Sequence, residues 1–162
     1  MSSCFFIGHR ETGPALLPEI KAAAESLIRQ QQVSDFYVGM YGNFDSLAGE
    51  AIIQLKREYP DIRLFLVLPY HPADRPIEVQ PGYDGSFYPD GMEAVSRRYT
   101  IAKANRKMID TSDFLIAYVT HTVSHAHDLL EYAMRRQRKG LIRVIHLGER
   151  NESSACSGKN LP

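Results

Sequence analysis

Hydrophobic and polar positions follow two rhythms along the chain: short apolar runs, and longer stretches with helical spacing. The short runs end at glycine, proline or polar residues, which predicts buried strands. Between them, apolar residues recur every three or four positions, which predicts amphipathic helices. The predicted strands are residues 4–7, 36–38, 62–68, 114–119 and 141–147, and the predicted helices are residues 14–31, 45–59, about 99–110 and 126–139.

The segment 69–91 follows neither rhythm and is rich in Pro, Gly, Asp and Tyr. We interpret it as a long loop, and loops of this length in compact domains are usually functional or mobile. Its aromatic residues Tyr83, Phe87 and Tyr88 leave two interpretations open. They close over a ligand as a lid, or they anchor the loop to the core.

Strands that alternate with helices in this way predict an α/β fold with a parallel sheet and helices on both faces. We expect a Rossmann-like three-layer sandwich whose five-stranded parallel sheet has the order 3-2-1-4-5. Ligands bind such sheets where the strand order reverses, here between the first and fourth strands. The domain is expected to span residues 1–148, and residues 149–162 to form a polar, flexible tail.

Composition narrows the classes of partner. The 162 residues include 19 basic and 19 acidic ones, so the formal net charge is zero. A neutral chain gives no electrostatic reason to bind duplex DNA or an anionic membrane surface. Cys4 lies in the first apolar run and Cys156 in the polar tail, which predicts two reduced thiols. Because neither a secretory signal nor an apolar run of membrane-spanning length is found, we expect a cytoplasmic protein.

The turn after the first strand is the first candidate site. It contains Gly8, which has no Cβ, followed by the imidazole of His9 and the permanent cation of Arg10. A guanidinium and backbone amides at this edge of a sheet can bind a phosphate or carboxylate. The alternative is a structural turn with an exposed arginine.

The second candidate site follows the second strand, in the sequence G-M-Y-G-N-F-D. Gly39 and Gly42 permit close approach of a ligand to the backbone. Asp45 has two competing uses, as the N-cap of the next helix or as acceptor of a ribose hydroxyl. The glycine spacing fits neither the dinucleotide fingerprint nor the P-loop, which argues against an ordinary NAD dehydrogenase or ATPase.

Two further segments carry candidate side chains. Arg106 borders the apolar stripe of its helix, so it either faces a ligand or covers the core with its stem. The segment T-H-T-V-S-H-A-H-D precedes a helix whose N-terminus can hold an anion. Its three histidines, His121, His125 and His127, invite a metal hypothesis, but a titrating or hydrogen-bonding histidine is the favoured interpretation. No metal site is therefore predicted.

Several of these stretches occur together in a known group of proteins. They are C-F-F-I-G-H-R, G-x-x-G-x-F-D, V-L-P-Y, Y-P-D-G-M-E and N-R-K-M-I-D-T-S-D-F-L-I-A-Y-V, followed by a helix with L-E-Y-A. In this order, over about residues 3–147, the chain resembles the SLOG superfamily, specifically its small single-domain bacterial branch. The superfamily has a Rossmann-like fold and includes lysine-decarboxylase-like phosphoribohydrolases, the DNA-processing protein DprA and sensors of nucleotide-derived ligands.

The resemblance to the phosphoribohydrolases is partial. Those enzymes carry an arginine before the fourth strand and the motif G-G-x-G-T-x-x-E after it. The resemblance places Arg106 at the first position and Glu131 at the last. Side chains replace the three glycines, and an acid replaces the threonine: Ser124, His125, His127 and Asp128. These side chains restrict the approach of backbone amides to a phosphate, which argues against phosphoribohydrolase chemistry.

We therefore expect a protein that binds or senses a nucleotide or nucleotide-derived small molecule at the carboxyl edge of the sheet. The expected ligand-binding residues are Gly8, His9, Arg10, Gly39, Gly42, Asp45, Tyr88, Asn105, Arg106, Ser124 and His127. An enzyme that cleaves an N-glycosidic bond of a nucleoside monophosphate, with Arg106 and Glu131 as catalytic residues, is the alternative, and a DprA-like nucleic-acid-processing module is less favoured. No cofactor and no membrane partner are expected, and a homodimer stays open.

Overall fold

The computed structural model describes residues 2–148. Its strands and helices alternate along most of this range, as the sequence predicts. The strands are β1 (Ser2–Gly8), β2 (Val33–Val38), β3 (Arg63–Val67), β4 (Gly85–Phe87), β5 (Phe114–Tyr118) and β6 (Arg143–His146). The α-helices are α1 (Leu17–Gln31), α2 (Asn43–Leu55), α3 (Thr100–Thr111) and α4 (His125–Arg138), and the short 3₁₀ helices are η1 (Pro14–Leu16), η2 (Met92–Ala94) and η3 (Arg97–Tyr99).

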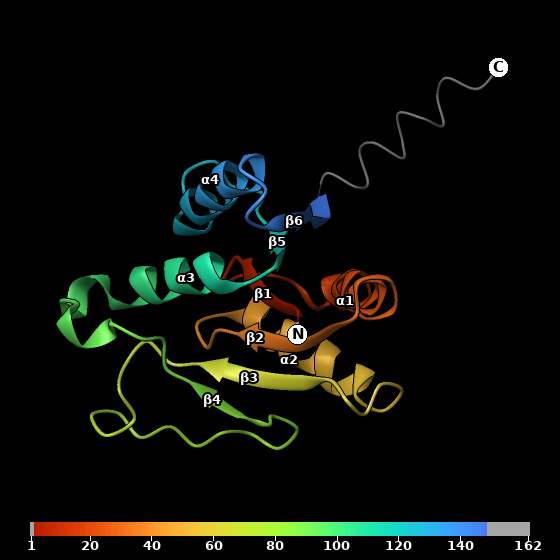
Figure 1. Cartoon of the computed structure of the whole chain (residues 1–162), viewed down its shortest axis with the longest axis horizontal. Helices are drawn as coiled ribbons and strands as arrows, with labels where there is room; N and C mark the ends of the chain where they lie inside the picture. Colours follow the sequence, from red (N-terminus) through yellow and green to blue (C-terminus); the bar gives the residue numbers. More distant parts are fainter. Residues whose placement is uncertain (1, 149–162) are drawn as a thin grey trace.

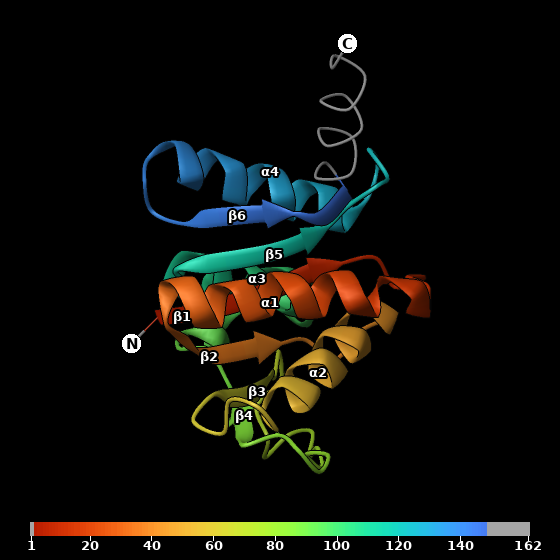
Figure 2. The same ribbon diagram turned by 90° about the vertical axis from the view of Figure 1, so that its right-hand side faces the viewer.

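All six strands form one parallel sheet with the order β4-β3-β2-β1-β5-β6. Helices α1 and α2 cover one face of the sheet and helices α3 and α4 cover the other (Figure 1). The view turned by 90° shows α1 and α2 in front of the sheet (Figure 2). This is the three-layer arrangement with Rossmann-like topology that right-handed crossovers produce.

The predicted order of the five expected strands is confirmed, but the predicted strand number is wrong. The sixth strand, β4, lies inside the segment 69–91 that the sequence predicts as loop, and it pairs with the outer side of β3 through Leu66 and Ser86. It has only three residues, Gly-Ser-Phe, which is too short to show a period of two. The pairing across the sheet, and not a local pattern, makes this segment a strand.

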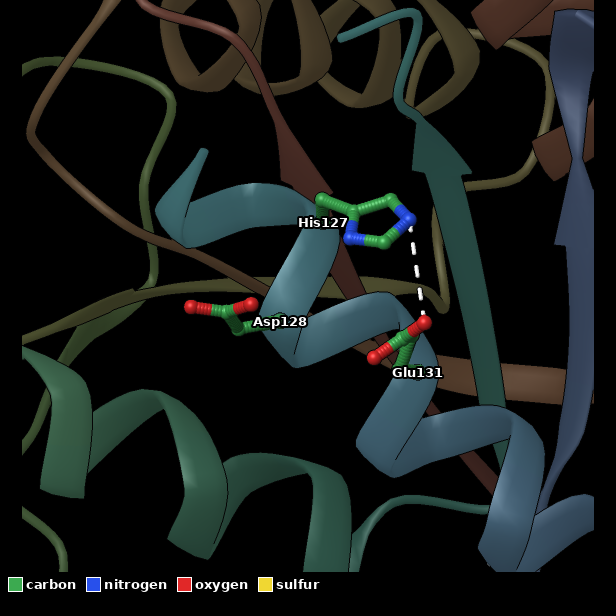
Figure 3. A group of neighbouring side chains, drawn as sticks. All are labelled: His127, Asp128 and Glu131. Atoms are coloured by element: carbon green, nitrogen blue, oxygen red, sulfur yellow. Dashed lines mark ion pairs between the residues drawn. The ribbon is translucent and has the colours of Figure 1, made fainter. Parts of the chain in front are cut away.

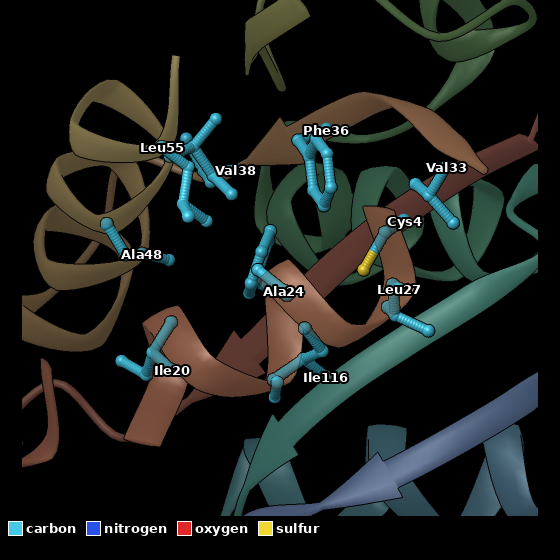
Figure 4. Packing of buried hydrophobic residues seen from close by; sticks show 14 of the residues in the cluster. Cys4, Ile20, Ala24, Leu27, Val33, Phe36, Val38, Ala48, Leu55 and Ile116 are labelled. Carbon is cyan, nitrogen blue, oxygen red and sulfur yellow. The ribbon is translucent and has the colours of Figure 1, made fainter. Parts of the chain in front are cut away.

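The core consists of two apolar clusters, one on each face of the sheet. Cys4 and Phe6 of β1 belong to the cluster beneath α1 and α2, whereas Phe5 and Ile7 belong to the cluster beneath α3 and α4. Figure 4 shows the first cluster, in which Ile20 and Ala24 of α1 face the sheet. Successive side chains of a strand point to opposite faces, so a central strand buried on both faces must be apolar throughout. This explains the uninterrupted apolar run at the start of the chain.

The start of α2 differs from the prediction. Gly42, and not Asp45, occupies the N-cap position, and the helix begins at Asn43. The carboxylate of Asp45, in the first turn, accepts a hydrogen bond from the backbone N–H of Tyr41 (3.1 Å). The side chain therefore reaches back over the helix start to the residue before the N-cap, one position beyond the N–H that the acid of a capping box binds. The interpretation of Asp45 as the N-cap residue is wrong.

The ends of α4 agree better with its sequence. The Ser124 hydroxyl accepts a hydrogen bond from the His127 N–H (3.1 Å) at the N-cap. At the other end, Gly140 has a φ of +74°, the left-handed conformation that favours glycine after a helix. Both ends of α4 are therefore explained by their local sequence.

Three further predictions concern the chain as a whole. Cys4 is a free, buried cysteine, while Cys156 and the predicted tail 149–162 lie outside the described residues. Within the part of the chain that is described, no helix combines the length and the apolar character that crossing a bilayer requires.

Candidate functional site

A cleft of about 670 Å³ opens at the edge of the sheet where β1, β2 and β5 end. Four segments line it: β1 with the turn that follows, the loop between β2 and α2, the segment from η3 into α3, and the start of α4. Its volume lies within the range of small-molecule sites. The position matches the place where open α/β sheets bind ligands.

The cleft brings together many of the residues that the sequence analysis singles out, but not all of them. The predicted residues that line it are Gly8, His9, Arg10, Gly39, Asp45, Asn105 and Ser124. The predicted residues outside its lining are Gly42, Tyr88, Arg106, His127 and Glu131. The lining also includes polar and aromatic side chains that were not predicted as ligand contacts, among them Glu11, Tyr41, Arg98 and Tyr99.

His9 connects the end of β1 to the loop after β5. Its Nε2 atom accepts hydrogen bonds from the backbone N–H groups of Thr120 (2.8 Å) and His121 (3.3 Å). Its ring also lies 4.5 Å from the ring of His121, measured between centroids. Burial lowers the pKa of His9, and the neighbouring His121 lowers it further. His9 is therefore held as a neutral ring whose Nε2 is unprotonated.

We expect the His9 imidazole to titrate below its ordinary value of 6.5 and to carry its proton on Nδ1. The unfolded chain then binds a proton at His9 more readily than the folded chain. The contribution of His9 to stability is therefore lost as the pH falls below about 6.5. Nitrogen-15 NMR of the ring measures both the pKa and the tautomer. His9→Gln, which keeps an acceptor but cannot titrate, is the control and lacks this pH dependence. Titration of His9 at or above pH 6.5 contradicts the assignment.

Asp45 is a partly buried carboxyl group on the wall of the cleft. Burial raises its pKa to about 6, although the Tyr41 N–H and the nearby Arg10 both act in the opposite direction. Its Oδ2 atom also lies 2.8 Å from the position that a Cβ on Gly39 would occupy. The absence of a side chain at Gly39 thus gives Asp45 its place beside the backbone of β2.

The glycines at two other turns are required by packing of the chain on itself. A Cβ on Gly8 would lie 2.2 Å from the Phe44 ring, and a Cβ on Gly42 would lie 2.7 Å from the backbone Cα of Arg10. Both separations are far shorter than a van der Waals contact. The turn after β1 and the loop after β2 therefore touch directly, and the backbone N–H of Asn43 donates to the Arg10 carbonyl (2.9 Å).

Arg106 does not take its expected place at the cleft. Its guanidinium lies 4.8 Å from the centroid of the Tyr132 ring on α4, between the two helices of that face. The guanidinium that joins Arg10 at the cleft is that of Arg98, on η3. Regular helical spacing places Arg98 and Arg106 on one face, but the turn of 3₁₀ helix before Thr100 changes the angular relation between them.

The aromatic residues of the long loop anchor it. The Phe87 ring packs edge-on against Tyr37 of β2, with 5.4 Å between centroids, whereas the Tyr88 ring packs on His71 of the same loop. Tyr83 packs over α2 at Gly49, where a Cβ would lie 2.2 Å from the tyrosine hydroxyl. For Tyr83 and Phe87, contact with the rest of the fold is the interpretation that the structure supports.

His127, Asp128 and Glu131 form a separate group on the first turns of α4 (Figure 3). Their ligand atoms lie within 4.8 Å of one another, and His127 Nε2 is 3.9 Å from Glu131 Oε1. Asp128 and Glu131 are exposed. The group differs from the three histidines that prompted the metal hypothesis, since His121 and His125 line the cleft instead. Exposed donors on one helix turn do not by themselves define a metal site.

No protein-family model and no curated protein matches the chain.

Proposed function

We propose that the cleft binds a nucleotide or a nucleotide-derived small molecule, and that the protein acts as a binding or sensing module. The observation that carries this proposal is a pair of guanidinium groups, Arg10 and Arg98, on the lining of one cleft. Within residues 2–148, neither has a carboxylate oxygen at ion-pair distance. Two cations without ion-pair partners attract a ligand that carries negative charge, and guanidinium groups suit phosphate.

The start of α4 adds to this attraction. Ser124, His125 and Ala126 line the cleft at the N-terminus of a helix of 14 residues. Free backbone N–H groups and the helix dipole make such an end favourable for an anion. The cleft also has apolar walls, including side chains of β1 and α3, which suit the uncharged part of a nucleotide.

The resemblance to the SLOG superfamily supports the same proposal, since members of that superfamily bind nucleotide-derived ligands. It supports the phosphoribohydrolase alternative less well. Arg106 and Glu131, the residues assigned to catalysis, lie outside the lining of the cleft. The proposal therefore assigns neither residue a chemical role, and it includes no turnover.

Isothermal titration calorimetry with ADP and ADP-ribose tests the proposal. Loss of a charge-assisted hydrogen bond to phosphate weakens binding by roughly tenfold or more. We expect this loss in both Arg10→Ala and Arg98→Ala. The matched control is Arg29→Ala, which removes an exposed arginine from α1 and leaves the affinity unchanged. Incubation with nucleoside monophosphates is expected to release no free base. Unmeasurable binding of both ligands to the unmodified protein contradicts the proposal.

A further inference from the structure

Tyr99 is a large aromatic side chain exposed to water at the cleft. It is 58% exposed, yet it contributes to the lining of the cleft. The other exposed large hydrophobic residues of the described chain, which are Phe87, Val123 and Leu141, do not line the cleft. An aromatic ring left in water beside a binding site is available to cover the flat face of a ligand.

The backbone holds Tyr99 in a defined place. Its N–H donates to the carbonyl of Ser96 (2.9 Å), and it occupies the residue immediately before α3. The next residue, Thr100, is buried, and its hydroxyl donates to the same Ser96 carbonyl (3.1 Å). The backbone that carries the ring is therefore held in place where η3 meets α3, so a ligand does not have to order this part of the chain when it binds.

A cation lies next to this ring. The guanidinium carbon of Arg98 is 5.7 Å from the Tyr99 centroid. An aromatic surface and a phosphate-binding group therefore stand side by side on one segment of the cleft. In a nucleotide, one sugar joins an aromatic base to a phosphate. The base can therefore meet the ring while the phosphate meets the guanidinium. A sugar phosphate without a base would use the cation and leave the ring in water.

We propose that Tyr99 stacks on the base of the ligand while Arg98 binds its phosphate, so the cleft selects nucleotides over the corresponding sugar phosphates. This inference rests on the proposed function, and it adds the class of ligand that the site prefers. Stacking is tolerant of the base because every base offers a π-face. The Tyr99 ring therefore distinguishes ligands that carry a base from ligands that lack one. It does not distinguish one base from another.

Calorimetry with AMP and ribose 5-phosphate tests the inference, because the two ligands share the sugar and phosphate and differ in the base. Loss of one base–aromatic stack corresponds to a decrease of about ten- to a hundredfold in affinity. We expect Tyr99→Ala to weaken AMP binding by this factor and to leave ribose 5-phosphate binding unchanged. Tyr99→Phe, which keeps the ring, is expected to retain AMP affinity. Leu141→Ala, an exposed apolar residue outside the cleft, is the matched control.

The outcomes separate the two proposals. If AMP, ADP and ADP-ribose all fail to bind the unmodified protein, both the proposed function and the stacking role of Tyr99 are overturned. If nucleotides bind and Tyr99→Ala retains AMP affinity, only the stacking role of Tyr99 is overturned. The same conclusion follows if Tyr99→Ala weakens AMP and ribose 5-phosphate equally, since Tyr99 then supports the site without contacting the base. Thermal unfolding of each variant verifies that it is folded.

Discussion

Replacement of Gly8 by alanine is expected to lower the free energy of unfolding by about 3 kcal/mol or more. The new Cβ would lie 2.2 Å from Cγ of Phe44, a ring only 1% exposed. The ring is buried in the core beneath α1 and α2, and Gly8 itself is held in register with Tyr118 of β5. Relief of the clash therefore requires β1 and α2 to separate. Urea unfolding followed by circular dichroism measures the change, since the chain contains no tryptophan.

Gly13→Ala is the matched control for Gly8→Ala. A Cβ on Gly13 would meet no atom within 4 Å, and its φ of −75° suits alanine. Alanine there restricts the unfolded chain without straining the folded one, so stability is expected to rise by a few tenths of a kcal/mol. Equal effects of the two substitutions would contradict the assigned contact between Gly8 and Phe44.

The second large effect is expected at Asp45, where Asp45→Asn should stabilise the protein at neutral pH. Burial raises the folded-state pKa of Asp45 from 3.8 to about 6. The folded chain therefore holds the proton more tightly than the unfolded chain, and the stability of the protein decreases as the pH rises from about 4 to 6. At pH 7 the ionised carboxyl opposes folding by roughly 2 to 3 kcal/mol relative to a neutral group.

The amide that Asp45→Asn introduces stays neutral and keeps an oxygen that can accept the Tyr41 N–H. The variant is expected to exceed the unmodified protein in stability at pH 7 and to approach it at pH 4.5. Urea titrations at a series of pH values measure the difference. Asp84→Asn is a control with the opposite expected sign. Burial raises the pKa of Asp84, but bonds from Lys56 and the Leu64 N–H outweigh it and leave the net pKa below its ordinary value. A constant difference between Asp45→Asn and the unmodified protein at all pH values contradicts the expectation.

The fold was accessible from the sequence because its central strands are buried on both faces. The first run, from Cys4 to Ile7, contributes to both clusters, so it must be apolar at every position. The helices that cover these strands need an apolar stripe for the same reason, which makes their helical spacing visible in the sequence. The alternation of strands and helices then limits the possible strand orders to a few. These features are set by local sequence and by general rules of chain connection.

The arrangement of the site was less accessible because it depends on angles and contacts that periodicity does not describe. A 3₁₀ turn rotates Arg98 relative to α3, so the cleft contains Arg98 where the spacing suggests Arg106. The roles of Gly8 and Gly42 depend on Phe44 and Arg10, which are distant in sequence. Among the lining residues that were not predicted, Tyr99 has a readable signal, since it stands at the start of an amphipathic helix and outside its apolar stripe.

The three-residue length of β4 has a consequence for the behaviour of the protein in concentrated solution. An outer strand with unpaired N–H and C=O groups is a template on which another chain can add. Here that template is very short. Asp84 precedes it, bound to the Leu64 N–H and to Lys56, and Pro89 follows two residues after its end. Proline cannot donate a backbone hydrogen bond, so β4 cannot readily lengthen into an edge strand that pairs with another chain. This side of the sheet is thus protected against edge-to-edge aggregation.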